Sequence, residues 1–199
     1  RFQGQIDIPL NENGKDQARK TFEYLRNISF NKAFSSSMHR PYETAQIILQ
    51  NYIDLKIERI DSLVEISHGL WEGKLESEIK ENWPRLLKNW HNKPEEVIMP
   101  EGESIKDVSE RSIEAFNDIC LSQKDNDLTL LVAHDAVNKT LICNILGLNY
   151  SNIWMIKQGN GGITVIDLFN DPSKPPVISA LNITTHLGGI IDATASGAL

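Results

Sequence analysis

The sequence has no long hydrophobic run, few cysteines and more acidic than basic residues, and each of these limits excludes a class of protein. No window approaches the roughly 18 to 20 consecutive apolar residues of a membrane span, so we expect no membrane partner. The net charge of −7 disfavours general nucleic-acid binding, because phosphate backbones are held by clustered Lys and Arg. Cys120 and Cys143 lie in apolar helical patterns, which indicates reduced core thiols and a cytoplasmic location.

Several familiar catalytic motifs are absent as well. The sequence contains no G-x-x-x-x-G-K-[ST] loop, no G-x-S-x-G elbow, no H-E-x-x-H and no C-x-x-C. These absences remove support for nucleotide hydrolysis by a P-loop, for serine hydrolysis and for a zinc site of familiar type. We therefore expect neither a metal nor another cofactor.

What the sequence does contain is an alternation of helix and strand patterns. The predicted helices cover 11–27, 40–52, 105–121 and 134–147, and the predicted strands cover 31–37, 55–60, 128–133, 162–169 and 175–183. Ser104 with Asp107 forms a capping box at the start of one helix. The apolar run "LTLLVA" is typical of a strand buried on both faces. This alternation predicts a three-layer α/β domain.

Two strand-to-helix junctions carry residues that suit chemistry. Arg40 follows "AFSSS" and His134 follows "LLVA". In open α/β sheets, ligands bind beyond the carboxyl ends of the strands, where loops turn into helices. Taken singly, each residue is better explained by structure, as a solvated or salt-bridged Arg and a structural His.

Five segments together resemble the histidine phosphatase superfamily, also called the phosphoglycerate mutase-like family. They are "RFQGQIDIPLNENGKDQA", "SSSMHRPYETA", "LVEISHGLWEG", "PEGES" and "LVAHDAVNK", in the order in which the family has them. The resemblance covers nearly the whole chain. It implies an α/β/α sandwich with a mostly parallel, mixed sheet, formed by residues 1–187, and it leaves 188–199 as a C-terminal tail.

The resemblance implies a phosphate pocket with an acid beside it. Arg40 matches the family's pocket arginine, whose planar fork grips two phosphoryl oxygens. His134 matches the histidine that binds the phosphoryl group and stabilises its charge during transfer. Glu65 matches the acid that protonates the leaving alkoxide and later takes a proton from water. The family more often has glycines after this histidine, so Asp135 is a departure.

Three further positions match substrate contacts of the family. Gln3 and Gly4 match the loop over the substrate, and Asn160, in "QGNGGI", matches a loop near the pocket. The family's nucleophile is a histidine in an R-H-G motif at the end of the first core strand, and this sequence contains no such tripeptide. We therefore expect a chain that lacks that strand, and is inactive as it stands, because the phosphohistidine route needs an attacking imidazole.

The resemblance implies that the intact protein is an enzyme, a metal-independent phosphatase acting on small phosphorylated metabolites through a phosphohistidine intermediate. The short run from Gly69 to "MPEGES" favours a phosphatase, since dedicated phosphoglycerate mutases usually carry a longer insertion there. A phosphoglycerate mutase, a non-catalytic phosphate-binding module and an unrelated α/β binding domain remain as alternatives. A homodimer and a fused upstream domain remain open as partners.

Overall fold

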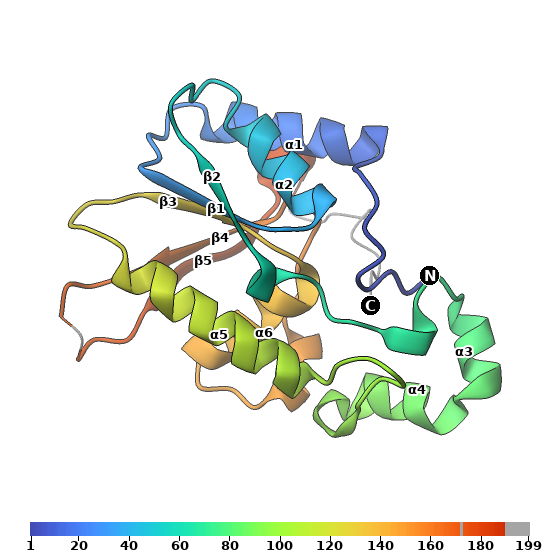
Figure 1. Ribbon diagram of the computed structural model, residues 1–199. Helices are drawn as coiled ribbons and strands as arrows, with labels where there is room; N and C mark the ends of the chain where they lie inside the picture. Colours follow the sequence, from blue (N-terminus) through green and yellow to red (C-terminus); the bar gives the residue numbers. More distant parts are fainter. Residues whose placement is uncertain (172, 190–199) are drawn as a thin grey trace.

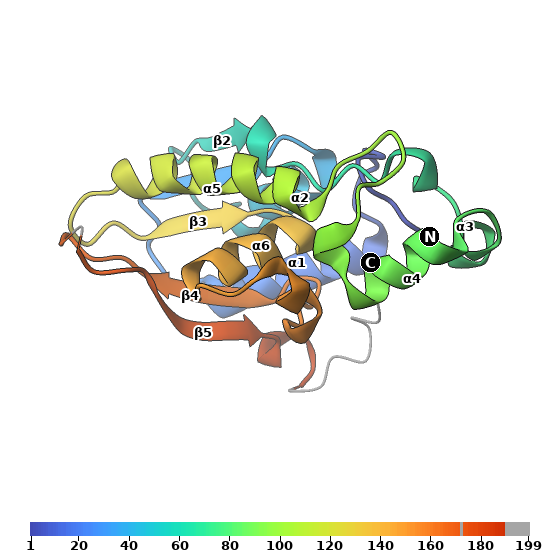
Figure 2. The ribbon, with the colours of Figure 1, turned by 90° about the horizontal axis from the view of Figure 1, so that it is seen from below.

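The structure, a computed structural model, describes residues 1–171 and 173–189. Its centre is a parallel sheet with the strand order β2-β1-β3, made of β1 (Lys32–Ser36), β2 (Ile57–Ile60) and β3 (Thr129–Val132). An antiparallel ribbon of β4 (Ile163–Asp167) and β5 (Val177–Ile183) lies on the β3 side of this sheet (Figures 1 and 2). The predicted α/β fold with a mostly parallel sheet is therefore confirmed.

Helices cover both faces of the sheet (Figure 1). One layer holds α1 (Glu12–Leu25) and α2 (His39–Ile48), and the other holds α5 (Ile105–Leu121) and α6 (Asp135–Ile145). The remaining helices, α3 (Glu76–Asn82) and α4 (Pro84–Asn92), lie beside the N-terminal segment, beyond the carboxyl ends of the strands. The strand ends at which the site is predicted therefore face the side of the molecule that carries α3 and α4 (Figure 1).

The helix boundaries follow the capping signals in the sequence. The Asn11 side chain accepts a hydrogen bond from the Gly14 N–H at 2.8 Å and caps α1. Ser104 and Asp107 form the predicted capping box at the start of α5. Gly147, which ends the α6 segment, has a φ of +64°, a conformation that favours glycine. These local predictions are confirmed.

The main core packs the α5–α6 layer against the sheet and the loops that follow β2. Its largest fully buried side chains include Trp71, Trp90, Leu63 and Ile66. Strand β3 differs from prediction, because all its residues are half-buried rather than buried on both faces. Within the described residues the ladders join β3 to β1 alone, so it forms an edge of the parallel sheet.

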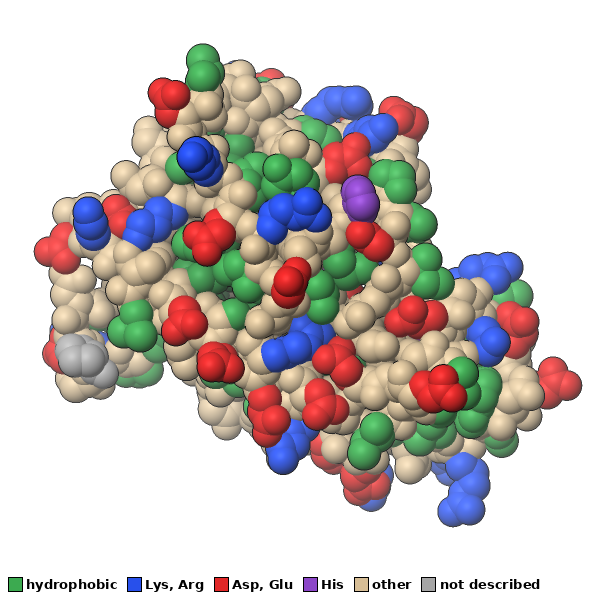
Figure 3. Space-filling view, viewed as in Figure 1, with side chains coloured by type: hydrophobic (Ala, Val, Ile, Leu, Met, Phe, Trp, Pro, Cys, Tyr) green, Lys and Arg blue, Asp and Glu red, His purple; other side chains and the backbone are tan. Residues whose placement is uncertain are grey.

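Some predictions concern the chain beyond these elements. Of the expected tail, 188–199, residues 190–199 lie outside the described residues. Among the described residues, no helix is both long and apolar enough to cross a membrane. On the face seen in Figure 3, acidic and basic side chains are interspersed.

Candidate active site

Three of the predicted site residues follow the carboxyl ends of three neighbouring strands. Arg40 lies in the first turn of α2, just after β1. His134 occupies the N-cap position of α6, just after β3, without a side-chain capping hydrogen bond. Glu65 follows the short 3-10 turn Asp61–Leu63, which comes directly after β2. Because the three strands are parallel, these residues share one edge of the sheet.

The His134 side chain is buried against the end of β1. Its Nε2 lies 3.0 Å from Ser36 Oγ, and 8% of the residue is exposed. Burial, and then the positive charges of Arg40 and Arg111, lower the pKa of His134 to about 3. The charge of Asp7 acts in the opposite direction. The imidazole is therefore neutral at pH 7, and a phosphoryl dianion beside it would favour its protonation.

Glu65 is a buried carboxyl group held by backbone N–H donors. Its Oε1 accepts from Ile66 N at 2.9 Å, and its Oε2 accepts from Asp135 N at 3.1 Å, at the start of α6. Burial raises the pKa of Glu65 to about 7; the charge of Asp135 adds to this effect and the N–H donors oppose it. At neutral pH such a group is present in both protonation states, so it can give or accept a proton.

Arg40 lies beside the N-terminal segment. Its Nη1 donates to the Ile6 carbonyl at 3.3 Å, and its charge acts on both His134 and Asp7. Asp7 in turn holds the start of α2, since its Oδ1 accepts from His39 N at 2.7 Å and its Oδ2 lies 2.6 Å from His39 Nδ1. Arg40 has five N–H donors, so donors remain for phosphoryl oxygens.

Arg111 on α5 fixes the segment that carries Glu65. Its Nε and Nη2 donate to the two carboxylate oxygens of Glu103, at 2.8 and 2.9 Å. Its Nη1 donates to the carbonyls of Ser62 and Val64 at 2.8 and 2.7 Å, and its Nη2 also reaches the Glu65 carbonyl at 3.1 Å. Sequence reasoning missed Arg111, because only the neighbouring "PEGES" segment, which holds Glu103, gave a signal.

The N-terminal segment packs against the loop after Glu65. Glu72 Oε1 accepts from Gln5 N at 2.9 Å, and Gln5 Nε2 donates to the Glu65 carbonyl at 2.9 Å. Gly4 has a φ of +52°, a conformation that favours glycine, and a Cβ there would lie 2.3 Å from Glu72 Oε1, so a larger residue would also displace the Glu72 side chain. Gln3 is exposed in the same segment. Gln3 and Gly4 thus lie near the Glu65 segment, and their contact with substrate stays a prediction.

A sequence model of the histidine phosphatase superfamily (branch 1) matches residues 1–182. The chain belongs to this superfamily. Histidine phosphatase relatives also match along most of their own length. Phosphoserine phosphatase 1 of Hydrogenobacter thermophilus is 31% identical, over 94% of this chain and 87% of the relative. "Probable phosphoglycerate mutase GpmB" of Cronobacter sakazakii is 32% identical, over 86% and 79%.

The chain also shares its fold with solved structures. Bacillus stearothermophilus YhfR superposes with a TM-score of 0.87 at 26% sequence identity, covering 94% of this chain and 91% of that structure. This agreement confirms the mostly parallel α/β architecture.

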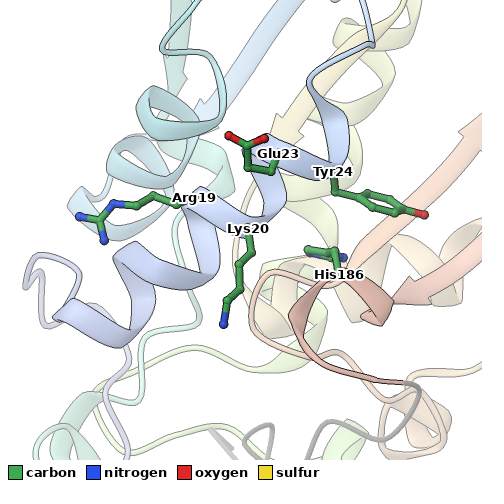
Figure 4. Close-up of a pocket in the computed structure, with 5 residues that line it drawn as sticks. All are labelled: Arg19, Lys20, Glu23, Tyr24 and His186. Atoms are coloured by element: carbon green, nitrogen blue, oxygen red, sulfur yellow. The ribbon is translucent and has the colours of Figure 1, made fainter.

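Asn160 lies apart from these three residues in the contacts of the structure. It is exposed, and its neighbours Gly159 and Gly161 contact Asn182 and His186, in β5 and the turn after it. A surface pocket of about 390 Å³ opens nearby, lined by Arg19, Lys20, Glu23, Tyr24 and His186 (Figure 4). None of the predicted site residues lines this pocket, and the role of Asn160 stays a prediction.

Proposed function

We propose that the intact protein is a phosphomonoesterase that acts on small phosphorylated metabolites through a phosphohistidine intermediate. The observation that carries the proposal is the joint position of a buried neutral imidazole, a buried carboxyl group and an arginine at the ends of β3, β2 and β1. In this proposal Arg40 and His134 bind the phosphoryl group. Glu65 is the acid and base.

The cationic part of the site fits a phosphoryl group that bears two negative charges. The Arg40 guanidinium can donate two parallel hydrogen bonds to phosphoryl oxygens. His134 is buried and neutral, so binding of a dianion favours uptake of a proton by its imidazole. The imidazolium would then stabilise the charge that spreads over the phosphoryl oxygens in transfer.

Glu65 supplies the proton transfers of both chemical steps. In the first step the ester O–P bond breaks, an N–P bond forms to the nucleophilic histidine, and Glu65 gives its proton to the leaving alkoxide. In the second step water attacks phosphorus, the N–P bond breaks, and Glu65 takes a proton from the water. A carboxyl group with a pKa near 7 suits both directions.

The nucleophile belongs to the family's R-H-G motif, which these 199 residues do not contain. We infer that the chain by itself binds phosphoryl groups without turning them over. This property is shared with the alternative function, a non-catalytic phosphate-binding module. The two differ in whether the protein expressed from its complete gene forms a phosphorylated intermediate.

The substrate class in this proposal is a phosphate ester of a small alcohol. The names of the relatives include a phosphatase of phosphoserine and a mutase of phosphoglycerate, both esters of this kind. A mutase returns the phosphoryl group to a second hydroxyl, whereas a phosphatase passes it to water. Phosphoserine and the phosphoglycerates are therefore the first compounds to test.

The experiment is a screen of phosphorylated metabolites with the protein from its complete gene, with and without a chelator. We expect release of inorganic phosphate in both conditions, and an acid-labile phosphoenzyme after rapid quenching. Loss of activity with chelator would overturn the metal-independent mechanism. Phosphate binding with no turnover of any compound would favour the binding module.

A further inference from the structure

A partly buried ion pair lies next to Glu65. Asp135, the first residue of α6, has its Oδ2 2.9 Å from Nζ of Lys139, one helical turn further on. The two side chains are 18% and 10% exposed, so the pair is largely removed from water. The Lys139 ammonium also lies 5.0 Å from the centre of the Trp154 ring. Taking two charges out of water costs free energy, so such a pair is weak evidence for a purely stabilising role.

A hydrogen bond joins the start of α6, which carries the pair, to the Glu65 side chain. The backbone N–H of Asp135 donates to Glu65 Oε2 at 3.1 Å, and the charge of the Asp135 carboxylate acts on Glu65. Asp135 Oδ1 is buried and has no hydrogen-bond partner within the described residues. Two ionised carboxylates in a site of low polarity repel each other, so the lower-energy arrangement has one negative charge and one proton between them. The position of Lys139 decides which carboxyl keeps the charge.

We propose that Asp135 and Lys139 form a positioning pair that keeps the catalytic proton on Glu65. Lys139 holds the negative charge on Asp135, and that charge disfavours a second one on Glu65. The inference rests on the proposed function, because it gives the pair a catalytic purpose through Glu65. Neither Asp135 nor Lys139 is assigned a contact with substrate.

The electrostatics around Glu65 support this assignment. Burial raises the pKa of both Glu65 and Asp135, but Lys139 lowers that of Asp135, while Asp135 raises that of Glu65. Further charged or titratable groups near Glu65 include Arg40 on α2, Arg111 on α5 with its partner Glu103, His134 at the start of α6, and His68 and Glu72 in the loop after Glu65. None of these side chains donates a hydrogen bond to the carboxyl oxygens of Glu65, because the donors to those oxygens are backbone N–H groups.

The direct test is the titration of the Glu65 carboxyl carbon by 13C NMR in the 199-residue chain, with the Glu65→Gln variant used to assign the signal. In the Asp135→Asn variant we expect the midpoint to fall by about one pH unit or more. The double variant Asp135→Asn with Lys139→Met removes the cation that the first change leaves unpaired. We expect its midpoint to stay below that of the unchanged chain.

A matched control breaks a comparable pair elsewhere. Lys32 and Asp127 lie 3.4 Å apart, with side chains 28% and 13% exposed, and neither residue is at the strand ends that carry the site. Asp127→Asn should leave the Glu65 midpoint unchanged. The proposal is overturned if the midpoint is also unchanged in the double variant, or if Asp127→Asn moves it equally. A double variant that folds keeps the test decisive even if Asp135→Asn alone does not fold.

Turnover then separates this inference from the proposed function. In the protein from its complete gene, a fall of one pH unit in the Glu65 midpoint would lower the protonated fraction at pH 7.5 by about eightfold. We expect that loss with phosphoserine, whose alkoxide needs a proton, and little loss with p-nitrophenyl phosphate, whose phenolate leaves unaided. Equal losses on both substrates would overturn the positioning role. Absence of turnover in the unchanged protein would instead overturn the proposed function and leave the NMR result standing.

Discussion

His134 and Glu65 lie at the ends of two strands on either side of β1, and the same physical cause acts on them in opposite directions. Each residue is 8% exposed. Burial disfavours charge, so it lowers the pKa of the imidazole to about 3 and raises that of the carboxyl to about 7. The difference teaches that burial prepares His134 to receive a dianion and Glu65 to donate a proton.

The largest expected effect comes from removing the imidazole of His134. His134→Ala, in the protein from its complete gene, should lower kcat/KM for phosphoserine by about 10³-fold, because a charge-stabilising donor is lost in the transition state. Circular dichroism should show an unchanged fold. The control is His91→Ala on α4, an exposed histidine, which should keep full activity. Wild-type turnover by His134→Ala would contradict the phosphoryl-binding role.

The role of Glu65 as the acid is tested by replacing its carboxyl group with an amide, which has no proton to give. Glu65→Gln should lower kcat for phosphoserine by about 10²-fold, the loss typical of a general acid, but should lower it much less for p-nitrophenyl phosphate. Steady-state kinetics on the two substrates measure the split. Glu58→Gln, an exposed change on β2, should affect neither substrate. A loss of equal size on both substrates would mean that Glu65 does not act as the acid.

A smaller effect is expected from Arg111, which positions the segment that carries Glu65. Arg111→Lys keeps the positive charge but cannot donate to Glu103 and to the carbonyls before Glu65 at once. We expect kcat to fall by about tenfold with KM nearly unchanged, since the acid is displaced while the phosphate-binding groups remain. Arg85→Lys, an exposed change on α4, is the control. A rise in KM alone would place Arg111 in substrate binding instead.

The smallest effect is on the pH dependence of stability, to which the buried histidines and Glu65 contribute in opposite directions. Buried His134 and His68, with pKa values of about 3 and 4, contribute stability above pH 6.5 that is lost as the pH falls. Glu65, whose pKa is raised to about 7, contributes stability below its unfolded value of 4.5 that is lost as the pH rises towards 7. Near pH 5.5 the two histidines together change the free energy of unfolding with pH more than Glu65 does.

Urea unfolding at pH 5 and pH 6 measures this balance. These three groups together should raise the free energy of unfolding by about 1 kcal/mol per pH unit in the unchanged chain. In Glu65→Gln the opposing group is gone, so this slope should increase by about 1 kcal/mol per pH unit. An identical slope in the two proteins would show that Glu65 has an ordinary pKa in the folded state.

The sequence alone predicts where the strands end, but it does not predict the interactions between segments that meet at those ends. Periodicity and capping signals predict β1, β3 and the helices after them, and thereby the places of Arg40 and His134. The role of Arg111 depends on the packing of α5 against the loop after β2, which no local pattern encodes. The contact of His134 with Ser36 has the same origin, because it joins two strands far apart in the chain.

The error about β3 has a similar cause. An apolar run predicts a strand that tends to be buried, but the sequence does not specify how many strands flank it. In the described structure β3 pairs with β1 alone and is half-buried. Asp135 was noted as a departure from the family's glycines, yet its partner Lys139 becomes visible only when the helix places them one turn apart.

The edge position of β3 matters for handling the purified protein. An unprotected strand edge is a template on which another chain can add a strand. Thr129–Val132 contains no proline and no charged side chain that would hinder such pairing. The β4–β5 ribbon lies on this side of the sheet, so another chain could add a strand to β3 only if the ribbon moved away, and we expect strand-paired aggregation to begin under conditions that loosen the ribbon.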